Sequence, residues 1–264
     1  MELRSNNFSS IKYHDIFDFK LTKEELVRWQ YKQSLPSAEG KNLKETTRGI
    51  KNKSRLQREI YSQEKLKIAK KTAKLISILP TVKFIGITGA LAMNNAGKNS
   101  DIDLMIVTSH NKLWTTRLLV YGLLWVTDYK LRKPKNDIEK DRLCLNLWLD
   151  EQDLVWSKSD RNIYTAHEIA QIVPLINKDK TYEKFLWENR WILNFWPNSV
   201  EILNPNIEKL NKSQLLIFNS LNLIAYKLQY LYMKPKITRE VVTLTRAIFH
   251  PNDWGKVVIA KLSS

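Results

Sequence analysis

Short apolar runs separated by turn-forming residues dominate the middle of the chain. Residues 82–88 and 102–107 are two such runs, and their length and β-branched content predict buried strands. A third strand is predicted at 143–149. Helical spacing of apolar residues predicts a short helix at 91–95 and a long one at 113–128. Strands that alternate with helices in this order indicate an α/β fold built on one sheet.

The first 80 residues have a helical pattern that is interrupted by a polar stretch. Two short helices are expected before residue 30, and Thr22 and Glu25 have the spacing of a capping box between them. This pair of helices resembles the start of a helix-turn-helix or winged-helix module. Residues 34–53 are polar and are expected to form a loop, whereas 54–79 predicts a long helix that ends at Pro80.

The apolar spacing after residue 150 is helical. Predicted helices span 162–172, 181–195, 211–233 and 239–249, so the C-terminal region is expected to be all-helical. One face of the 211–233 helix is apolar, and its members are expected in the core: Leu215, Phe218, Leu221, Ile224 and Leu228. The patterns together divide the chain into an N-terminal helical segment at 1–53, an α/β core with its leading helix at 54–155, and a helical domain at 156–264.

The charge balance is strongly basic. The 264 residues include 43 Lys and Arg against 27 Asp and Glu, a net charge of +16, which favours polyanionic partners. Residues 41–74 hold 12 Lys and Arg and 3 Glu, a net charge of +9. A long helix with a solvated basic face is one interpretation of this segment. RNA or DNA binding is the second, and contact with a membrane surface is the third.

Several features favour a cytoplasmic protein. Cys144 is the one cysteine and lies in an apolar strand, so it cannot form an internal disulfide, and a reducing compartment is expected. The amino-terminal residues lack the apolar stretch of a signal peptide. The longest apolar run, at 215–233, is interrupted by polar residues, so a buried helix explains it better than a membrane span.

Asp101 and Asp103 open the second predicted strand. Because side chains alternate along a strand, residues two apart point to the same face. Two neighbouring carboxylates repel each other unless a cation lies between them. Their hard oxygen atoms favour Mg²⁺, and with it chemistry on phosphoryl groups.

Gly89 and Ala90, followed after ten residues by Asp101-Ile102-Asp103-Leu104, resemble the signature of the DNA polymerase beta-like nucleotidyltransferase superfamily. Ser100, before Asp101, matches a frequent form of this signature. The resemblance covers about residues 82–150 and implies a small mixed sheet with flanking helices. The whole chain resembles, more loosely, uncharacterised bacterial nucleotidyltransferase-domain proteins with a winged-helix-like front and a helical tail.

The resemblance implies transfer of a nucleoside monophosphate from a nucleoside triphosphate to an acceptor, with release of pyrophosphate. Asp101 and Asp103 would hold Mg²⁺, or Mn²⁺ in its place, and Gly89 would let the backbone approach a phosphate. The candidate nucleotide-binding residues are Thr88, Gly89, Ala90, Lys98, Ser100 and Arg117. A solvated surface role is the alternative for Lys98 and Arg117. Acceptors in this superfamily include RNA, proteins and small molecules, so the acceptor is left open.

Two departures from the signature bear on activity. Ala90 stands where the superfamily usually has glycine or serine, so it offers no hydroxyl to a phosphate, a role that Thr88 could take. On the strand at 143–149, Asn146 replaces the usual third carboxylate. Its amide oxygen can be a neutral metal ligand, but it cannot be a general base. Alternation predicts the four leucines of this strand on one face, and on the other Cys144, Asn146, Trp148 and Asp150.

Two main hypotheses follow, and a third remains open. The first is a Mg²⁺-dependent nucleotidyltransferase with Asp101 and Asp103 as catalytic metal ligands and Asn146 as a further ligand. The second is a protein of the same fold that has lost full catalysis and binds nucleotide or nucleic acid. The third is an interaction module that uses the helical tail. His167 and Glu168 lack the partner histidine of a zinc-protease helix, so a surface or capping role and a role at the nucleotide site both stay open.

Overall fold

The structure is a computed structural model, and it describes residues 10–32, 53–132, 139–205, 219–249 and 253–264. Nearly all of the loop expected at 34–53 lies outside the described residues. The same holds for the beginning of the basic segment and for the part of the predicted 211–233 helix before Asn219, which includes Leu215 and Phe218.

A six-stranded mixed sheet forms the centre of the molecule, with the strand order β4-β1-β2-β3-β6-β5. The strands are β1 (Val82–Ile87), β2 (Ile102–Thr108), β3 (Leu143–Asp150), β4 (Val173–Asn177), β5 (Val241–Val242) and β6 (Arg246–Ile248). β2 and β3 are parallel and are linked through α6 (Leu113–Val126), whereas the other neighbouring pairs are antiparallel. The expected α/β class and its first three strands are confirmed.

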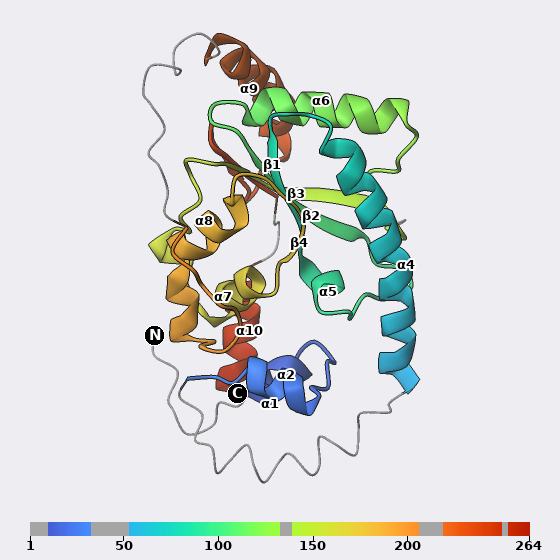
Figure 1. Cartoon of the computed structure of the whole chain (residues 1–264), viewed down its shortest axis with the longest axis vertical. Coiled ribbons are helices and arrows are strands. Elements are labelled where there is room, and N and C mark those ends of the chain that lie inside the picture. Colours follow the sequence, from blue (N-terminus) through green and yellow to red (C-terminus); the bar gives the residue numbers. More distant parts are fainter. Residues whose placement is uncertain (1–9, 33–52, 133–138, 206–218, 250–252) are drawn as a thin grey trace.

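Helices cover both faces of the sheet, which explains why its central strands are almost entirely apolar. One core cluster joins the sheet to α4 (Lys53–Ile76), α6 and α9 (Asn219–Met233). The other joins it to α1 (Ser10–Asp15), α2 (Lys23–Arg28), α7 (Ile163–Ala170), α8 (Thr181–Glu188) and α10 (Trp254–Ser263). Short helical turns complete the chain: α5 (Gly89–Ala92), η1 (Lys158–Asp160), η2 (Arg190–Asn194) and η4 (Lys234–Lys236). Figure 1 shows α6 and α9 at one end of the molecule and α1, α2 and α10 at the other.

The N-terminal helices are fixed to α4 through the predicted capping box. The Thr22 hydroxyl accepts a hydrogen bond from the amide of Glu25, and the Glu25 carboxylate accepts one from the amide of Thr22. The Arg55 guanidinium on α4 also binds the Glu25 carboxylate, at 2.7 Å. The capping box is therefore confirmed, and it joins two parts of the fold.

The expectation of an all-helical C-terminal region is wrong. Three of the six strands come from it, and the sheet therefore crosses the segment boundary expected at residue 155. The helix predicted at 239–249 is a hairpin of β5 and β6, and its β-branched residues fit a strand better than a helix. Two further helices also differ, because α8 ends at Glu188 before a 3-10 turn and α10 was not predicted.

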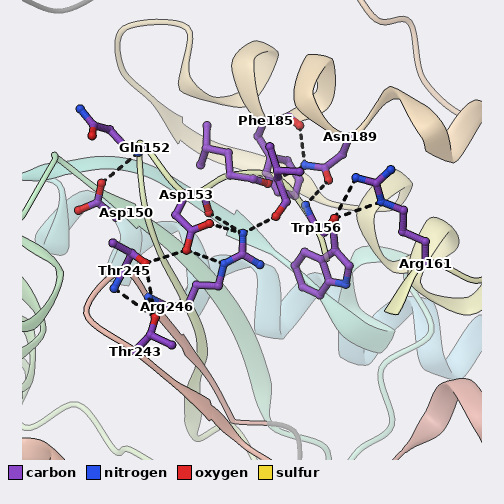
Figure 2. A network of polar contacts seen from close by, with 12 residues as sticks. Asp150, Gln152, Asp153, Trp156, Arg161, Phe185, Asn189, Thr243, Thr245 and Arg246 are labelled. Carbon is purple, nitrogen blue, oxygen red and sulfur yellow. Dashed lines mark hydrogen bonds and ion pairs between the residues drawn. The ribbon is translucent and has the colours of Figure 1, made fainter. Parts of the chain in front are cut away.

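The hairpin is anchored by a polar network that reaches the end of β3 (Figure 2). The Arg246 guanidinium binds the Asp153 carboxylate at 2.6 Å and also donates to the Asp153 carbonyl oxygen. The Thr245 hydroxyl donates to the same carboxylate at 2.7 Å. These bonds fix the hairpin to the segment after β3, which explains how strands as short as β5 and β6 are held in the sheet.

The predicted alternation on β3 is also wrong. Leu143 and Leu145 belong to the core cluster of α4 and α6, whereas Leu147 and Leu149 belong to the cluster on the opposite face. The cause is an irregularity in the β2–β3 ladder. Asp103 pairs with Cys144 and Met105 pairs with Leu147, so two steps along β2 match three steps along β3.

The apolar stripe of α9 does not lie in the core as expected. Leu221, Ile224 and Leu228 are 60%, 54% and 62% exposed. The buried face of the helix instead carries Asn222 and Gln229. The Asn222 side-chain oxygen accepts hydrogen bonds from the amides of Trp114 and Thr115, and this places a cap from one helix on the first turn of another.

Among the described residues, no helix combines the length and the apolar character that a bilayer span requires.

Candidate active site

The two aspartates of the predicted metal pair lie together at the start of β2. Asp101 immediately precedes the strand and Asp103 is its second residue. Carboxylate oxygens from both residues and the thiol of Cys144 all lie within 4.8 Å of one another. The arrangement expected from their two-residue spacing is therefore present, and neighbouring β3 adds a third side chain to it.

The glycine turn packs directly against this pair. Gly89 has a φ of +62°, and a Cβ atom placed on it would lie 2.7 Å from the Oδ2 atom of Asp103. Both the backbone conformation and the space therefore require glycine. The amide of Thr88 donates to the Asp103 carbonyl oxygen at 3.1 Å, which fixes the turn beside the strand.

Asn146 completes the cluster from β3. Its Nδ2 atom donates to the Oδ1 atom of Asp103 at 2.7 Å. Its Oδ1 atom is buried and has no hydrogen-bond partner. A buried amide oxygen without a donor is costly unless something else binds it. Its nitrogen, rather than this oxygen, points at Asp103, so the amide would turn over for the oxygen to share a cation with the two carboxylates; with that turn these residues fit a metal ion.

The donor atoms favour a hard metal ion. Burial, followed by the charges of Asp103 and Asp101, raises the pKa of Cys144 far above its usual range, so its sulfur stays a neutral thiol. A neutral thiol is a weak ligand, whereas carboxylate and amide oxygens suit Mg²⁺ and Mn²⁺. The side chains of Asp101, Asp103 and Asn146 therefore form the more suitable ligand set.

The electrostatics of the pair also favour a cation. Burial raises the pKa of Asp103 to about 7, and the neighbouring charge of Asp101 adds to this effect. An ionised Asp103 is thus costly in the protein alone. A divalent ion between the carboxylates would remove that cost.

Arg132 is a cationic neighbour that the sequence analysis did not single out. Its Nη1 atom donates to Asp101 Oδ2 at 2.8 Å and lies 3.8 Å from the sulfur of Cys144, while its Nη2 atom binds Glu139. The guanidinium is 41% exposed, so it borders the pair from the solvent side. The only signal in the sequence was a basic stretch before the third strand.

The loop before Asp101 is held by a buried lysine. Lys65 of α4 donates to the carbonyl oxygens of Ser100 and Lys98 and pairs with Asp141 at 2.5 Å. The Ser100 hydroxyl donates to the Gly97 carbonyl oxygen, so it closes the loop rather than facing the pair. Lys98 has an exposed side chain on the same loop.

The other candidates of the glycine turn lie where the sequence analysis expected them. Thr88 is buried, and it precedes α5 without a side-chain cap bond. Ala90 is exposed at the first turn of α5. The described cluster thus brings Gly89, Asp101 and Asp103 together, with Thr88 and Ala90 on the adjoining turn.

Arg117 lies away from this cluster. Its guanidinium donates to Gln229 on α9 at 2.6 Å and packs on the rings of Tyr121 and Phe249, which belong to the cluster of α4, α6 and α9. Asp103, in contrast, lies two residues before Met105 on β2, so the two side chains share a face of the sheet. Met105 belongs to the core cluster of α1, α7 and α10, which covers the face opposite to that of Arg117. The structure therefore does not bring Arg117 to the predicted nucleotide site.

Asp150 does not replace the missing carboxylate. It is fully buried and pairs with Thr108, at the far end of β2 from Asp103. Its carboxylate accepts hydrogen bonds from the amides of Asn111 and Gln152. These contacts hold the loop after β2, which is a structural role.

A different carboxyl group approaches the site from α7. Glu168 accepts a hydrogen bond from the Gln171 amide at 2.7 Å, and the same Gln171 nitrogen donates to the Gly89 carbonyl oxygen at 3.4 Å. Burial, together with the charge of Asp103, raises the pKa of Glu168 to about 8. Of the two roles left open for this residue, the structure places it at the glycine turn.

His167, beside Glu168, is buried against the N-terminal helices. Its Nε2 atom lies 3.0 Å from Nε2 of His14, and the Nδ1 atom of His14 lies 2.7 Å from the Ser10 carbonyl oxygen. Because a carbonyl only accepts, His14 carries its proton on Nδ1, and its Nε2 accepts from His167. Burial lowers the pKa of both rings, so both are neutral.

Comparison with known proteins leaves the family open. No protein-family model matches the chain, and no curated protein matches it. Among solved structures, the chain is similar to a STING-associated CdnE c-di-GMP synthase from Capnocytophaga granulosa, with 16% identity over 95% of each chain and a TM-score of 0.29. A likeness at this level establishes neither a family nor an activity.

Proposed function

We propose that the protein is a divalent-metal-dependent nucleotidyltransferase that moves a nucleoside monophosphate from a nucleoside triphosphate to an acceptor. One observation carries this proposal. Two carboxylates lie together beside a turn that only glycine can form, and the side chain of Asn146, whose amide oxygen has no partner, contacts one of them. That combination suits Mg²⁺ or Mn²⁺ next to a phosphate group.

Each residue has a defined part in this proposal. Asp101, Asp103 and Asn146 would hold the metal, which would supply charge neutralisation for the triphosphate. Gly89 lets the backbone approach the phosphates. Arg132 is partly exposed and is paired with Asp101 and Glu139; a metal that took over Asp101 would release it toward phosphate oxygens, the role once expected of Arg117.

The reaction is balanced without a redox partner. An oxygen or nitrogen of the acceptor forms a bond to the α-phosphorus, the bond from that phosphorus to pyrophosphate breaks, and a proton is released. The protein contributes position and electrostatic stabilisation, which are the main sources of rate acceleration in phosphoryl-type transfer.

A nucleotide- or nucleic-acid-binding protein of the same fold is the second candidate. Four exposed lysines along α4 favour it: Lys67, Lys70, Lys71 and Lys74. Asn146 in place of a carboxylate, and Ala90 in place of a hydroxyl-bearing residue, favour it as well. Binding of this kind would weaken steeply as salt rises and would survive the loss of Asp101.

Metal binding and label transfer together test the two candidates. Mn²⁺ binding is measured by electron paramagnetic resonance, and transfer is measured with each α-³²P-labelled triphosphate in the presence of Mg²⁺ or Mn²⁺. The proposal expects both in the wild-type protein and neither in Asp103→Asn. Equal metal binding by the variant, or wild-type protein that binds Mn²⁺ yet transfers no label to any acceptor offered, would contradict the enzyme.

A further inference from the structure

A cavity of about 310 Å³ adjoins the glycine turn, between the segment after α1, α7 and the first turn of α10, and Arg58 of α4 also lines it. Figure 1 shows α7 and α10 next to each other on one side of the sheet. Gly89 and Ala90 form its edge toward the metal pair. A volume of this size suits one compact organic group.

The walls of this cavity are largely aromatic. Phe17, Phe19, Tyr164 and Trp254 line it. The rings of Phe17 and Tyr164 are inclined by only 24°, with centroids 6.3 Å apart. Because these two rings stack on each other, a flat ligand ring would pack against their edges and against Phe19 and Trp254, contacts that aromatic side chains favour.

The same walls are unsuited to a triphosphate. Arg58 lines the cavity, but its guanidinium is bound by Asp18 at 2.5 Å and by Asn95 at 2.9 Å. His14 and His167 line it as neutral rings bonded to each other. The described residues that line the cavity therefore offer no unpaired cation to a phosphate.

Glu168 gives the cavity a polar group that prefers a hydrogen-bond donor to a phosphate. Its single side-chain hydrogen bond among the described residues comes from Gln171, so a carboxyl oxygen remains for a ligand. Gln171 also holds the Gly89 carbonyl oxygen, which fixes the distance between this polar group and the glycine turn. The carboxyl group is ionised less readily than usual, but a bound cationic amine would hold it ionised and a hydroxyl would donate to it, whereas a phosphate would further oppose its ionisation.

We propose that this cavity is the acceptor site of the transfer reaction, and that it takes a neutral or cationic compound with a flat ring and a hydroxyl or amino group that donates to Glu168. This inference rests on the proposed function, because only a transferase has an acceptor. The triphosphate then lies on the Asp101 and Arg132 side of the glycine turn, and the acceptor lies on the Glu168 side. The two substrates thus meet at Gly89.

A matched pair of probes tests the site without metal or nucleotide. Tyramine carries a phenol ring and a cationic amine, and 3-(4-hydroxyphenyl)propionate carries the same ring with a carboxylate. Binding is measured by ligand-observed saturation-transfer NMR and by titration. Tyramine is expected to bind the wild-type protein at least tenfold more tightly than the anionic probe.

Three variants locate the binding. Ala90→Trp fills the edge of the cavity and is expected to abolish tyramine binding, whereas Ala260→Trp, at an exposed position of α10 outside the cavity, leaves it unchanged. Glu168→Gln keeps the shape and removes the carboxyl group that a bound amine would hold ionised, so the preference for tyramine over the anionic probe is expected to fall below threefold.

Absence of tyramine binding, equal binding of the two probes, or full binding by Ala90→Trp would overturn the inference. These results are independent of the metal assay. If the protein binds Mn²⁺ but not tyramine, only the acceptor-site inference is refuted. If it binds tyramine but not Mn²⁺, the proposed transfer reaction is refuted.

Discussion

Two helices on opposite faces of the sheet, α7 and α9, both bury polar side chains, but they do so for different reasons. On α9, the Asn222 oxygen accepts from two backbone amides of α6, and Gln229 accepts from Arg117 and donates to the Trp114 carbonyl oxygen. On α7, Glu168 retains an unbonded oxygen at a cavity. A buried polar residue therefore points to a site only when part of its bonding capacity is left for a ligand.

The largest effect on the α7 face of the sheet is expected from a substitution in the glycine turn. Gly89→Ala is expected to lower the free energy of unfolding by about 2–4 kcal/mol, because it adds a strained φ and a contact with Asp103. Mn²⁺ binding should be lost with it. Denaturant unfolding provides the measurement. Gly122→Ala is the control, since Gly122 lies in α6 with open space around it and the change should stabilise by about 0.5–1 kcal/mol.

The histidine pair beneath α7 should make stability depend on pH. Burial lowers the pKa of His14 from 6.5 to about 4, so below pH 6.5 the unfolded chain takes up a proton that the folded protein refuses. Stability is complete above pH 6.5 and falls as the pH drops toward 4, with a loss of about 2 kcal/mol at pH 5. Urea unfolding at pH 7.5 and pH 5 measures the loss, and His14→Gln should show a smaller difference. If His14→Gln lost as much stability between pH 7.5 and pH 5 as the wild-type protein, the histidine pair would not be the cause of the pH dependence.

Asp103 should trade stability for metal binding. Its pKa is raised to about 7, so ionisation in the folded protein is opposed, and the cost increases from about pH 4 until it is complete above pH 7. Asp103→Asn is therefore expected to stabilise the metal-free protein by about 1–2 kcal/mol at pH 8, and by nothing below pH 4. Thermal unfolding at the two pH values measures this, and a variant that is less stable at pH 8 would contradict it.

The exposed stripe of α9 should be the most tolerant region. Leu228→Ser is expected to change the free energy of unfolding by less than about 0.5 kcal/mol, because the side chain is 62% exposed. Asn222→Ala, one and a half turns away on the buried face, should cost about 1 kcal/mol through loss of the cap on α6. Chemical denaturation of both variants compares the faces. A larger loss for Leu228→Ser would mean that the stripe is covered.

The centre of the fold and the closeness of Asp101 to Asp103 could be predicted from the sequence, because both depend on short-range spacing. The three central strands are long and apolar, and two aspartates two residues apart must share a face. The short strands β4 and β6 were missed, since they pair with β1 and β3, more than 60 residues away, and β5 was missed with them because it pairs only with β6. Arg117 was misplaced for a related reason: its helix packs on the other face of the sheet.

The irregularity in β3 and the approach of Glu168 could not be predicted from local patterns. Strict alternation put Asn146 and Trp148 on one face, and only the ladder with β2 shows that an extra residue separates their environments. Glu168 reaches the glycine turn through Gln171, a contact between residues more than 80 positions apart. Tertiary packing, rather than propensity, decides both.

Lys65 changes how the basic character of the chain should be interpreted. This lysine has no access to solvent and is committed to carbonyl groups and Asp141, while Arg55 and Arg58 on the same helix are bound to acidic partners. Fixed cations of this kind displace no counterions from a polyanion. The salt dependence of any polyanion binding should therefore reflect only the hydrated lysines of α4. The formal charge of this helix overstates its affinity for a phosphate backbone.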